Sequence, residues 1–404
     1  MSTTAPSPAR ASGDGRREAN AATVLRVVLD HAPVARSGIA RLSGLSPAAV
    51  SRQCTDLTRL GLLREVPEQV AASGVGRPQI PVDLRTGDAG GPLVVGLHIG
   101  VPASTFGLSD LRGTVVARRM FAHDGVPAAD LPDHVGRALA RFVADHAPPG
   151  ARLLGVGAAI GGWVDPETGT VVRHDALGWH QRPLAAELRR HTGLPVRVDN
   201  HARAVARSEL LFGRPAARRS LLHLFVGNVV DAALSIAGVV HTGPRSGAGD
   251  VSHLPVPDST VMCPCGRTGC LEVTVSDTRL TRRAVERGII PEPLISLLAD
   301  AAAAGDRRAD TLLRERAHAV GRAAGLLLDV LNPDLLVVTE SSLLFQGDYL
   351  DEIRAAAIAH AHVFDDPDRI VVPHAGPEAL LVAAATLVLD PMFRSPLAFG
   401  DTPG

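Results

Sequence analysis

The stretch Gly247–Glu272, GAGDVSHLPVPDSTVMCPCGRTGCLE, is the most informative part of the chain. Three of the four cysteines, Cys263, Cys265 and Cys270, fall within eight residues, and His253 lies ten residues before the first of them. One imidazole and three thiolates form a closed tetrahedral set for Zn²⁺, with no open position for water. The spacing therefore predicts a structural zinc site held by these four side chains.

An alternative interpretation of this stretch is a set of buried or disulfide-bonded thiols. Cys263 and Cys265 are too close for an easy bridge, and any single disulfide would leave an odd cysteine. Gly266 and Gly269 allow the backbone to turn tightly enough to bring Cys265 and Cys270 to one metal ion. These features favour the metal site.

The composition is that of a globular protein. A chain of 404 residues suits two or three domains, and 46% hydrophobic with 21% charged residues is ordinary for a soluble protein. The N-terminus has no secretory signal, and the most apolar window, Leu221–Val240, is interrupted by His223, Asn228 and Asp231. Clustered thiols without a disulfide framework fit a reducing compartment. We therefore expect a cytoplasmic protein that does not enter a membrane.

Charge is unevenly distributed along the chain. All 41 basic residues are arginine, which excludes a Walker-type phosphate lysine and a Schiff-base lysine. Residues 1–84 hold ten Arg against seven Asp and Glu, a charge of +3, so the net charge of −1 leaves −4 for the remainder. Residues 1–16 are rich in Ala, Ser, Pro and Gly and predict a disordered tail. A basic N-terminal part on an acidic body hints at nucleic acid binding at one end.

Residues 17–84 predict a winged helix-turn-helix domain. The first helix covers Arg17–Asp30, Ser37 caps a short second helix that Gly44 ends, and Ser46 caps the third. The third helix stands in the recognition position, where it can enter a major groove of double-stranded DNA.

The third helix has one apolar and one small, polar face. Val50, Cys54 and Leu57 recur at helical spacing and form the buried face. On the other face we expect Arg52 and Gln53 to reach base edges and the serines to meet phosphates. The predicted DNA-contacting residues of this helix are Ser46, Ala48, Ala49, Ser51, Arg52 and Gln53. The alternative is a small helical module for protein contact.

A wing follows the third helix. Leu62–Glu65 and Ile80–Leu84 predict two paired strands around a loop with the tip Gly76-Arg77-Pro78. This tip places Arg77 on a narrow ribbon suited to an A·T-rich minor groove. The wing, the helices and the basic charge together favour DNA binding.

The rest of the chain predicts two α/β lobes with a cleft between them. Residues 92–200 and 201–376 each contain a mixed sheet that opens with a hairpin and is flanked by helices. The strands that open the lobes are Leu93–Ile99 and Ser220–Val226. A C-terminal helix within 377–392 is expected to pack back on the first lobe.

With these elements placed, residues 20–390 resemble the ROK family of repressors, open reading frames and sugar kinases. CPCGRTGCLE (263–272) matches the family's C-x-C-G-x-x-G-C-x-E, and GAGDVSH (247–253) stands where the family has G-x-G-E-x-G-H. Further support comes from 154–165, Gly178-Trp179 and VDNHARAVARSE (198–209). The resemblance implies an actin-like, hexokinase-like two-lobed fold, a sugar pocket in the cleft and a homodimer or homotetramer. An N-terminal winged helix is typical of the repressor branch.

Three segments that would bind the nucleotide in a ROK kinase are altered. The family's D-x-G-G-T loop reads His98-Ile99-Gly100-Val101-Pro102, and Pro102 lacks the N–H that a phosphate would need. The G-T-G-x-G loop has become Gly227–Asp231, and the late glycine pair Glu340-Ser341. The family's catalytic aspartate aligns with His201. We therefore expect no ATP, no catalytic residues and no kinase activity.

The sugar side of the cleft is better preserved. The resemblance carries over as ligand-binding residues Asn200, His201, Asp250, His253 and Glu272. Carboxylates, an amide and imidazoles suit a polyol, because each hydroxyl both donates and accepts hydrogen bonds. His253 is expected to hold zinc with one ring nitrogen and meet a hydroxyl with the other. The alternative is a remnant that serves only the stability of the fold.

His201 and Arg203 replace the family's Asp and Asn, which suggests a more positive pocket edge and an anionic effector such as a sugar phosphate. The alternative is that Arg203 faces solvent.

Together these features predict a transcriptional regulator, most simply a repressor of genes for carbohydrate metabolism or transport. Its oligomer would read an inverted-repeat operator, and a small sugar or sugar phosphate would be the effector. One alternative is an active ROK sugar kinase with an appended DNA-binding head. The other is a regulator controlled by a non-sugar ligand or a protein partner.

Overall fold

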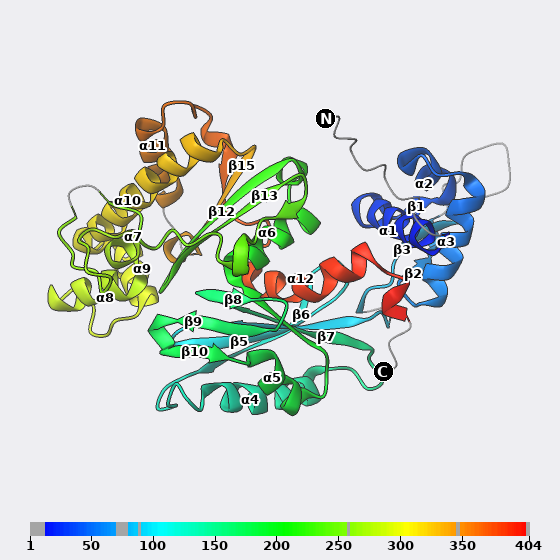
Figure 1. Cartoon of the computed structure of the whole chain (residues 1–404), viewed down its shortest axis with the longest axis horizontal. Helices are drawn as coiled ribbons and strands as arrows, with labels where there is room; N and C mark the ends of the chain where they lie inside the picture. The colour runs from blue at the N-terminus through cyan, green and yellow to red at the C-terminus, as the bar shows by residue number, and fades with distance from the viewer. Residues whose placement is uncertain (1–12, 70–79, 88–89, 257–258, 345–347, 401–404) are drawn as a thin grey trace, which may run out of the picture.

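The computed structural model describes residues 13–69, 80–87, 90–256, 259–344 and 348–400. A small head at one end contacts a larger body of two sheet-containing lobes (Figure 1). Each lobe has a mixed five-stranded sheet, with the orders β11-β7-β4-β5-β6 and β14-β13-β12-β15-β16. The predicted α/β class is confirmed.

The head has three helices and a three-stranded antiparallel sheet of order β1-β3-β2. Its elements are α1 (Gly13–His31), β1 (Val34–Ala35), α2 (Arg36–Ser43), α3 (Pro47–Arg59), β2 (Leu63–Glu65) and β3 (Pro81–Leu84). Helix α1 begins at Gly13, inside the segment predicted as a tail. Gly44 ends α2 with a φ of 70°, as expected, and the Ser46 Oγ accepts a hydrogen bond from the Ala49 amide at the start of α3.

The predicted cap of α2 is wrong. The helix begins at Arg36, and its N-cap residue is Ala35, which has no side chain to accept a hydrogen bond. Ala35 ends β1, whose pairing with β3 fixes the chain before the helix starts. Ser37 therefore lies inside the first turn of α2. The pairing of β1 with β3 sets the start of the helix, and the local sequence does not predict that pairing.

The first lobe is built on β4 (Leu93–Ile99), β5 (Ala103–Ser109), β6 (Val115–Ala122), β7 (Leu153–Ile160) and β11 (Val196–Asn200). Helices α4 (Leu131–His146) and α5 (Leu184–Thr192) cover one face of this sheet (Figure 1). A small second sheet of order β10-β9-β8 was not predicted. Its strands are β8 (Trp163–Asp165), β9 (Thr170–His174) and β10 (Trp179–Arg182). These strands are short and largely polar, so they lack the apolar alternation that marks a strand.

The second lobe is built on β12 (Ser220–Val226), β13 (Val230–Ile236), β14 (Val239–Val240), β15 (Leu335–Glu340) and β16 (Ile370–Val371). Its helices are α7 (Leu271–Val275), α8 (Asp277–Glu286), α9 (Ile295–Ala303), α10 (Arg307–Leu331) and α11 (Tyr349–His360). Helix α6 (His201–Phe212) connects the lobes: it begins beside the cleft and packs on β12 and β13.

The C-terminal helix α12 (Ala379–Arg394) packs on the first lobe's sheet, against β4 and β7, and on α6. Close approach is possible because two strand positions have no Cβ. A Cβ on Gly157 would lie 1.8 Å from the Ala384 carbonyl oxygen, and one on Gly96 2.8 Å from that of Leu381. Among the described helices, only the segment Gly376–Arg394 is long and apolar enough to cross a membrane, and 72% of its apolar window is buried inside the fold. It is a core helix.

The head and the first lobe share one apolar core. Val24, Leu25 and Val28 of α1 are fully buried in the same cluster as Val388 and Met392 of α12. Leu211, at the far end of α6, belongs to this cluster as well. Because these apolar side chains are fully buried, their contact holds the head against the body.

We predict that Gly157→Ala destabilises the first lobe, because the new methyl group would overlap a backbone carbonyl of α12 that cannot move freely. Overpacking of this kind costs about 1–3 kcal/mol or more, which thermal and denaturant unfolding would measure. Gly247→Ala is the matched control, because Gly247 has a φ of −95° and its added Cβ would meet nothing closer than 3.6 Å. Equal stabilities of the two variants would contradict this packing.

Candidate functional site

The four predicted metal ligands converge in the second lobe. One ligand atom from each of His253, Cys263, Cys265 and Cys270 lies within 4.8 Å of the others. The His253 Nδ1 is 3.7 Å from the Cys263 Sγ, and the Sγ atoms of Cys265 and Cys270 are also 3.7 Å apart. These separations are those of ligands around one tetrahedral ion, not of a disulfide, whose sulfur atoms lie about 2 Å apart. The cluster could hold a metal ion.

Tight turns bring the ligands together. Gly266 and Gly269 have φ values of 88° and 71°, which favour glycine. The Cys263 amide donates to the Arg267 carbonyl at 2.8 Å, closing the loop between the first and last thiols. The Glu272 amide donates to the Ser252 carbonyl at 3.0 Å, so the loop also positions the carboxylate beyond it.

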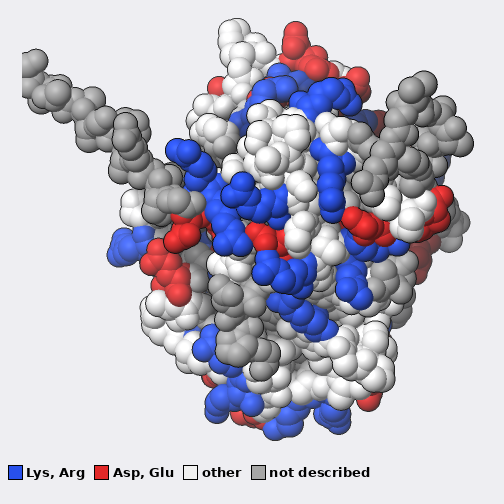
Figure 2. Space-filling view, turned by 90° about the vertical axis from the view of Figure 1, so that its right-hand side faces the viewer, with Lys and Arg blue, Asp and Glu red and all other residues white. Residues whose placement is uncertain are grey.

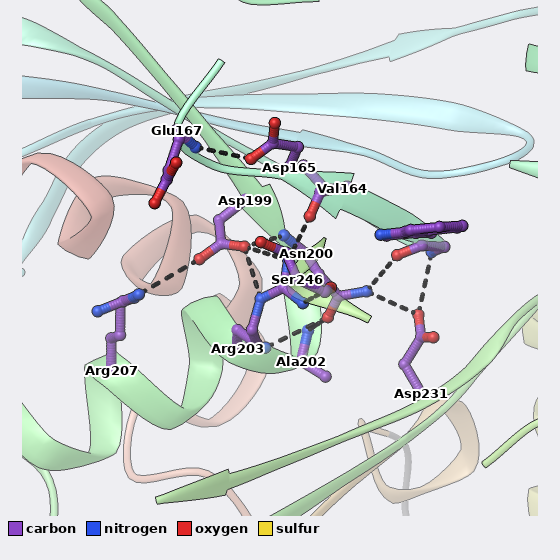
Figure 3. Close-up of polar contacts among 12 residues, drawn as sticks. Val164, Asp165, Glu167, Asp199, Asn200, Ala202, Arg203, Arg207, Asp231 and Ser246 are labelled. Atoms are coloured by element: carbon purple, nitrogen blue, oxygen red, sulfur yellow. Dashed lines mark hydrogen bonds and ion pairs between the residues drawn. The ribbon is translucent and has the colours of Figure 1, made fainter. Parts of the chain in front are cut away.

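Asn200 lies at the junction of β11, α6 and the cleft. Its side-chain oxygen accepts hydrogen bonds from the Ala202 and Arg203 amides at 2.8 and 3.3 Å, which caps α6. Its amide nitrogen donates to the Gly162 carbonyl at 2.8 Å and to the Asp231 Oδ2 at 3.1 Å (Figure 3). Every hydrogen-bonding position of this buried side chain is therefore used within the protein.

Asp231 joins the two lobes across the cleft. It comes from β13 in the second lobe, and its Oδ2 accepts from the Gly162 amide of the first lobe at 3.1 Å. The same oxygen lies 3.1 Å from the His201 Nε2. Burial opposes ionisation of Asp231, but the contact with His201 and the hydrogen bonds from Gly162 and Asn200 bring its pKa below the usual value. Local sequence alone gave no indication of this bridge.

Arg203 does not form a positive pocket edge, nor does it face solvent. Its guanidinium is 2% exposed and donates to the Asp199 carboxylate at 2.7 Å, and to the Val164 and Ser246 carbonyls at 2.7 and 3.0 Å (Figure 3). Both predicted alternatives are wrong. The arginine replaces a shorter side chain and reaches carbonyl groups of two other segments, which local sequence does not reveal.

The remaining predicted ligand residues differ in exposure. Glu272 is half-buried, and desolvation together with the nearby carboxylates of Asp231 and Asp250 raises its pKa to about 7. Asp250 is exposed, and its Oδ1 accepts from the Ser252 amide at 3.1 Å. His201 is 2% exposed, and its ring packs on Phe225 with 3.8 Å between centroids. The charged groups among the predicted ligand residues and Asp231 are therefore mainly carboxylates.

The three segments altered from the kinase pattern meet in one cavity. Its lining includes the loop from His98 to Ala103, residues 227–229, and Ser341. Asp231, at the end of the altered Gly227–Asp231 segment, does not line this cavity; its carboxylate contacts Gly162 and Asn200. Behind the cavity, Glu340 is 1% exposed and lies 2.9 Å from the Arg316 guanidinium, which also contacts Asp277 at 2.8 Å. A buried ion cluster thus fills the position of the family's glycine pair.

Five of the six residues predicted to contact DNA from α3 are accessible at the surface. Ser46, Ala48, Ser51 and Arg52 are exposed and Ala49 is half-buried. Figure 2, which views the head end of the molecule, shows many basic side chains on this end, with a few acidic ones among them. Arg52 and Arg41, the latter on α2, are exposed and form no ion pair within the described part of the chain. Arg41 was missed because a single arginine on a short helix has no distinguishing pattern.

The prediction for Gln53 is wrong, and that for Arg77 lies outside the described residues. Gln53 is 2% exposed, because α3 packs on both α1 and α2 and buries a wider face than its apolar stripe indicates. Its side chain cannot reach a base edge in this conformation.

The body has the two-lobed, hexokinase-like architecture, and the head is a winged helix. The ROK family profile matches residues 94–390, and the chain belongs to the ROK family. It is 34% identical over 397 residues to the transcriptional regulator Rv0485 of Mycobacterium tuberculosis, covering 93% of this chain and 86% of that one. It is 26% identical over 355 residues to the xylose repressor of Caldicellulosiruptor bescii, covering 84% and 87%.

Solved structures show the same fold. A ROK family transcriptional regulator, described as a homologue of the E. coli MLC protein, matches 95% of this chain and 98% of its own, with a TM-score of 0.73 and 20% identity. A ROK glucokinase from Streptomyces griseus, in complex with glucose and AMPPNP, matches 73% of this chain and 98% of its own, with a TM-score of 0.62 and 25% identity. The kinase matches a smaller share of this chain than the regulator does but has the same body fold, so body architecture alone does not distinguish a regulator from an enzyme.

We predict that Cys265→Ser lowers the metal content of the purified protein and the thermal stability of the second lobe. Replacing one thiolate of a closed set weakens binding, and a structural metal contributes directly to folding. Elemental analysis and thermal unfolding would measure both effects. Met262→Ser, at an exposed neighbouring position, is the control. A Cys265→Ser protein that is metal-free yet as stable as the control would contradict a structural role.

Asp231→Ala should loosen the cleft, because it removes the acceptor shared by the Gly162 amide and the Asn200 side chain. We expect faster amide hydrogen exchange in peptides that cover 160–165. Asp250→Ala serves as the comparison, since Asp250 is exposed and bonds within its own loop. Unchanged exchange in Asp231→Ala would show that other contacts hold the lobes.

Proposed function

We propose that this chain is a DNA-binding transcriptional regulator, most simply a repressor of genes for carbohydrate metabolism or transport, whose body senses a sugar and has lost kinase activity. One observation supports this most: the segments that would bind a nucleotide in a kinase line a largely apolar cavity backed by buried ion pairs, while the four possible metal ligands come together in the second lobe. The regulators among its relatives agree with this assignment.

Loss of kinase activity follows from groups that phosphoryl transfer needs. Catalysis requires a carboxylate to accept the hydroxyl proton and donors or cations to neutralise the phosphates. The catalytic position is His201, which contacts Asp231, and the loop from His98 offers Pro102 instead of an N–H. Glu340 and Asp277 place two carboxylates around Arg316 near the cavity, so this guanidinium is already neutralised.

The effector we favour is an uncharged polyol. The proposed contacts are His201, Asp231, Asp250, His253 and Glu272. Asn200, which the family resemblance also suggested, has its hydrogen-bonding positions occupied within the protein and shapes the wall of the site instead. Hydroxyl groups can donate to these carboxylates, whereas a phosphate would be repelled by them. Because Arg203 is bonded to Asp199, the anionic effector suggested by the sequence loses its basis.

Zn²⁺ is the metal that fits the ligand cluster best, since three thiolates and one imidazole are a structural zinc set. Because the His253 Nδ1 faces the thiols, its Nε2 remains available for a hydroxyl. Zinc would thus brace both the second lobe and one wall of the sugar site.

The head would bind DNA through α3, with Arg52 in the major groove and Ser46 and Ser51 at phosphates. Arg41 adds positive charge beside it, and Arg77 of the wing is the proposed minor-groove contact. Two heads of a homodimer, or pairs within a homotetramer, would read an inverted repeat in the cytoplasm.

Helix α6 offers a physical route from the effector to the head. Its first residue, His201, lies in the cleft, and Leu211 at the other end packs in the core shared with α1. Arg218, just beyond α6, contacts the Asp30 carboxylate of α1 with two bonds of 3.0 Å. An effector that moves the start of α6 would therefore shift the head and change operator affinity.

The test is a parallel measurement of DNA binding and catalysis. Duplexes enriched from random sequence by the wild-type protein would provide the operator, and D-glucose, D-xylose and N-acetylglucosamine the effector probes. We expect specific DNA binding, weakened by at least one probe, and no ATP-dependent phosphorylation of any. ATP-dependent phosphorylation would instead support the kinase alternative, and binding insensitive to all probes a non-sugar effector.

We predict that Arg52→Ala weakens operator binding by about 1–3 kcal/mol and relaxes sequence preference, as expected for a side chain at a base edge. Fluorescence anisotropy at several salt concentrations would measure both. Arg287→Ala, an exposed arginine of the second lobe, is the matched control. Equal operator affinity of the two variants would count against α3 as the recognition helix.

A further inference from the structure

The cavity between the lobes has the character of an apolar binding site. Its volume is about 180 Å³, and it is a partly open cavity bordered by the β4–β5 loop, β12 with the following turn, and the start of α12. The apolar lining side chains are Ile99, Val101, Pro102, Phe225, Val229 and Leu380. A ROK kinase would need phosphate-binding groups at these loops, so the present lining indicates a different occupant.

The cavity offers no cation for a negatively charged ligand. Among the described residues that line it there is no arginine, and its one carboxylate, Asp277, contacts Arg316 and accepts from the Ser341 hydroxyl at 2.7 Å. Burial, reinforced by neighbouring imidazoles, lowers the pKa of His98 to about 3 and that of His174 to about 4. Both rings are therefore neutral at pH 7, and the site favours an uncharged occupant.

Two imidazole nitrogens on the cavity wall lack a partner. The His98 Nε2 and the His201 Nδ1 are inaccessible to solvent and have no hydrogen bond within the described part of the chain. His201 is 2% exposed, and its ring is held against Phe225. A buried polar atom without a partner costs free energy that a ligand hydroxyl would recover. The two rings stack with 5.9 Å between centroids, so they form adjoining parts of the same cavity wall.

We propose that this cavity is a second ligand site, which binds a small, uncharged, largely apolar molecule with one hydroxyl group. An apolar cavity of about 150 Å³ holds one benzene molecule, so the present volume suits one six-membered ring with its hydroxyl. The apolar side chains bury the ring, and the hydroxyl bonds the histidine nitrogens. His201 forms the wall between this site and Asp231, so the occupant acts on the same start of α6 as the sugar.

Phenol is the probe, and benzoate is its anionic counterpart of similar shape. Isothermal titration and thermal unfolding of the full-length protein should show that phenol binds and raises the melting temperature, while benzoate does neither. Val229→Phe fills the cavity and should abolish phenol binding. Val239→Phe makes the same change at a residue that is 63% exposed on β14 and should bind phenol as the wild type does.

Absence of phenol binding to the wild type, or equal binding by Val229→Phe and Val239→Phe, would overturn the proposal, as would equally strong binding of benzoate. If Val229→Phe does not fold, Ala103→Leu narrows the cavity from the other lobe and replaces it. Operator binding is measured on the same preparations. If the protein binds phenol but no DNA, the proposed regulator function is wrong and the second ligand site stands, so the two conclusions are tested separately.

Discussion

The hydrogen bonds of Asn200 are the interaction on which the rest of the structure depends. Its oxygen fixes the first turn of α6, and its nitrogen holds the Gly162 turn and the Asp231 carboxylate of the opposite lobe. A side chain with both a donor and an acceptor group is needed, because aspartate could not donate to either oxygen. One residue thus sets the start of a helix, the shape of a ligand wall and the distance between two lobes.

Much of the fold follows from local sequence. The strands Leu93–Ile99 and Ser220–Val226 were predicted with their observed bounds, because each is a continuous apolar run buried on both faces. The strands β8 to β10 were missed because their residues are stabilised by one another and by neighbouring loops, not by an apolar periodicity. The start of α2 was missed for a similar reason, since pairing between β1 and β3 decides it.

In the candidate site, too, local spacing predicted some residues, whereas others depend on contacts between distant segments. The convergence of His253 and the three cysteines was predictable, because such short spacing is typical of residues that come together at a metal site. Arg203 and Asp231 were placed wrongly or overlooked because they bond residues far along the chain, and Gln53 because α3 packs on two other helices. Long polar side chains reach several ångströms beyond their own backbone, so helical position alone does not tell whether they face solvent, ligand or another segment.

The core shared by α1, α6 and α12 has a consequence for how such proteins can diversify. Because Val24, Leu25 and Val28 are buried against the body, the head is not an independently tethered domain. The segment 13–84 produced alone would expose these apolar side chains to solvent. Exchange of heads between relatives would require matching changes on the last turns of α12. If α3 reads DNA as proposed, sequence preference would change by substitutions on its outer face more readily than by exchange of the whole head.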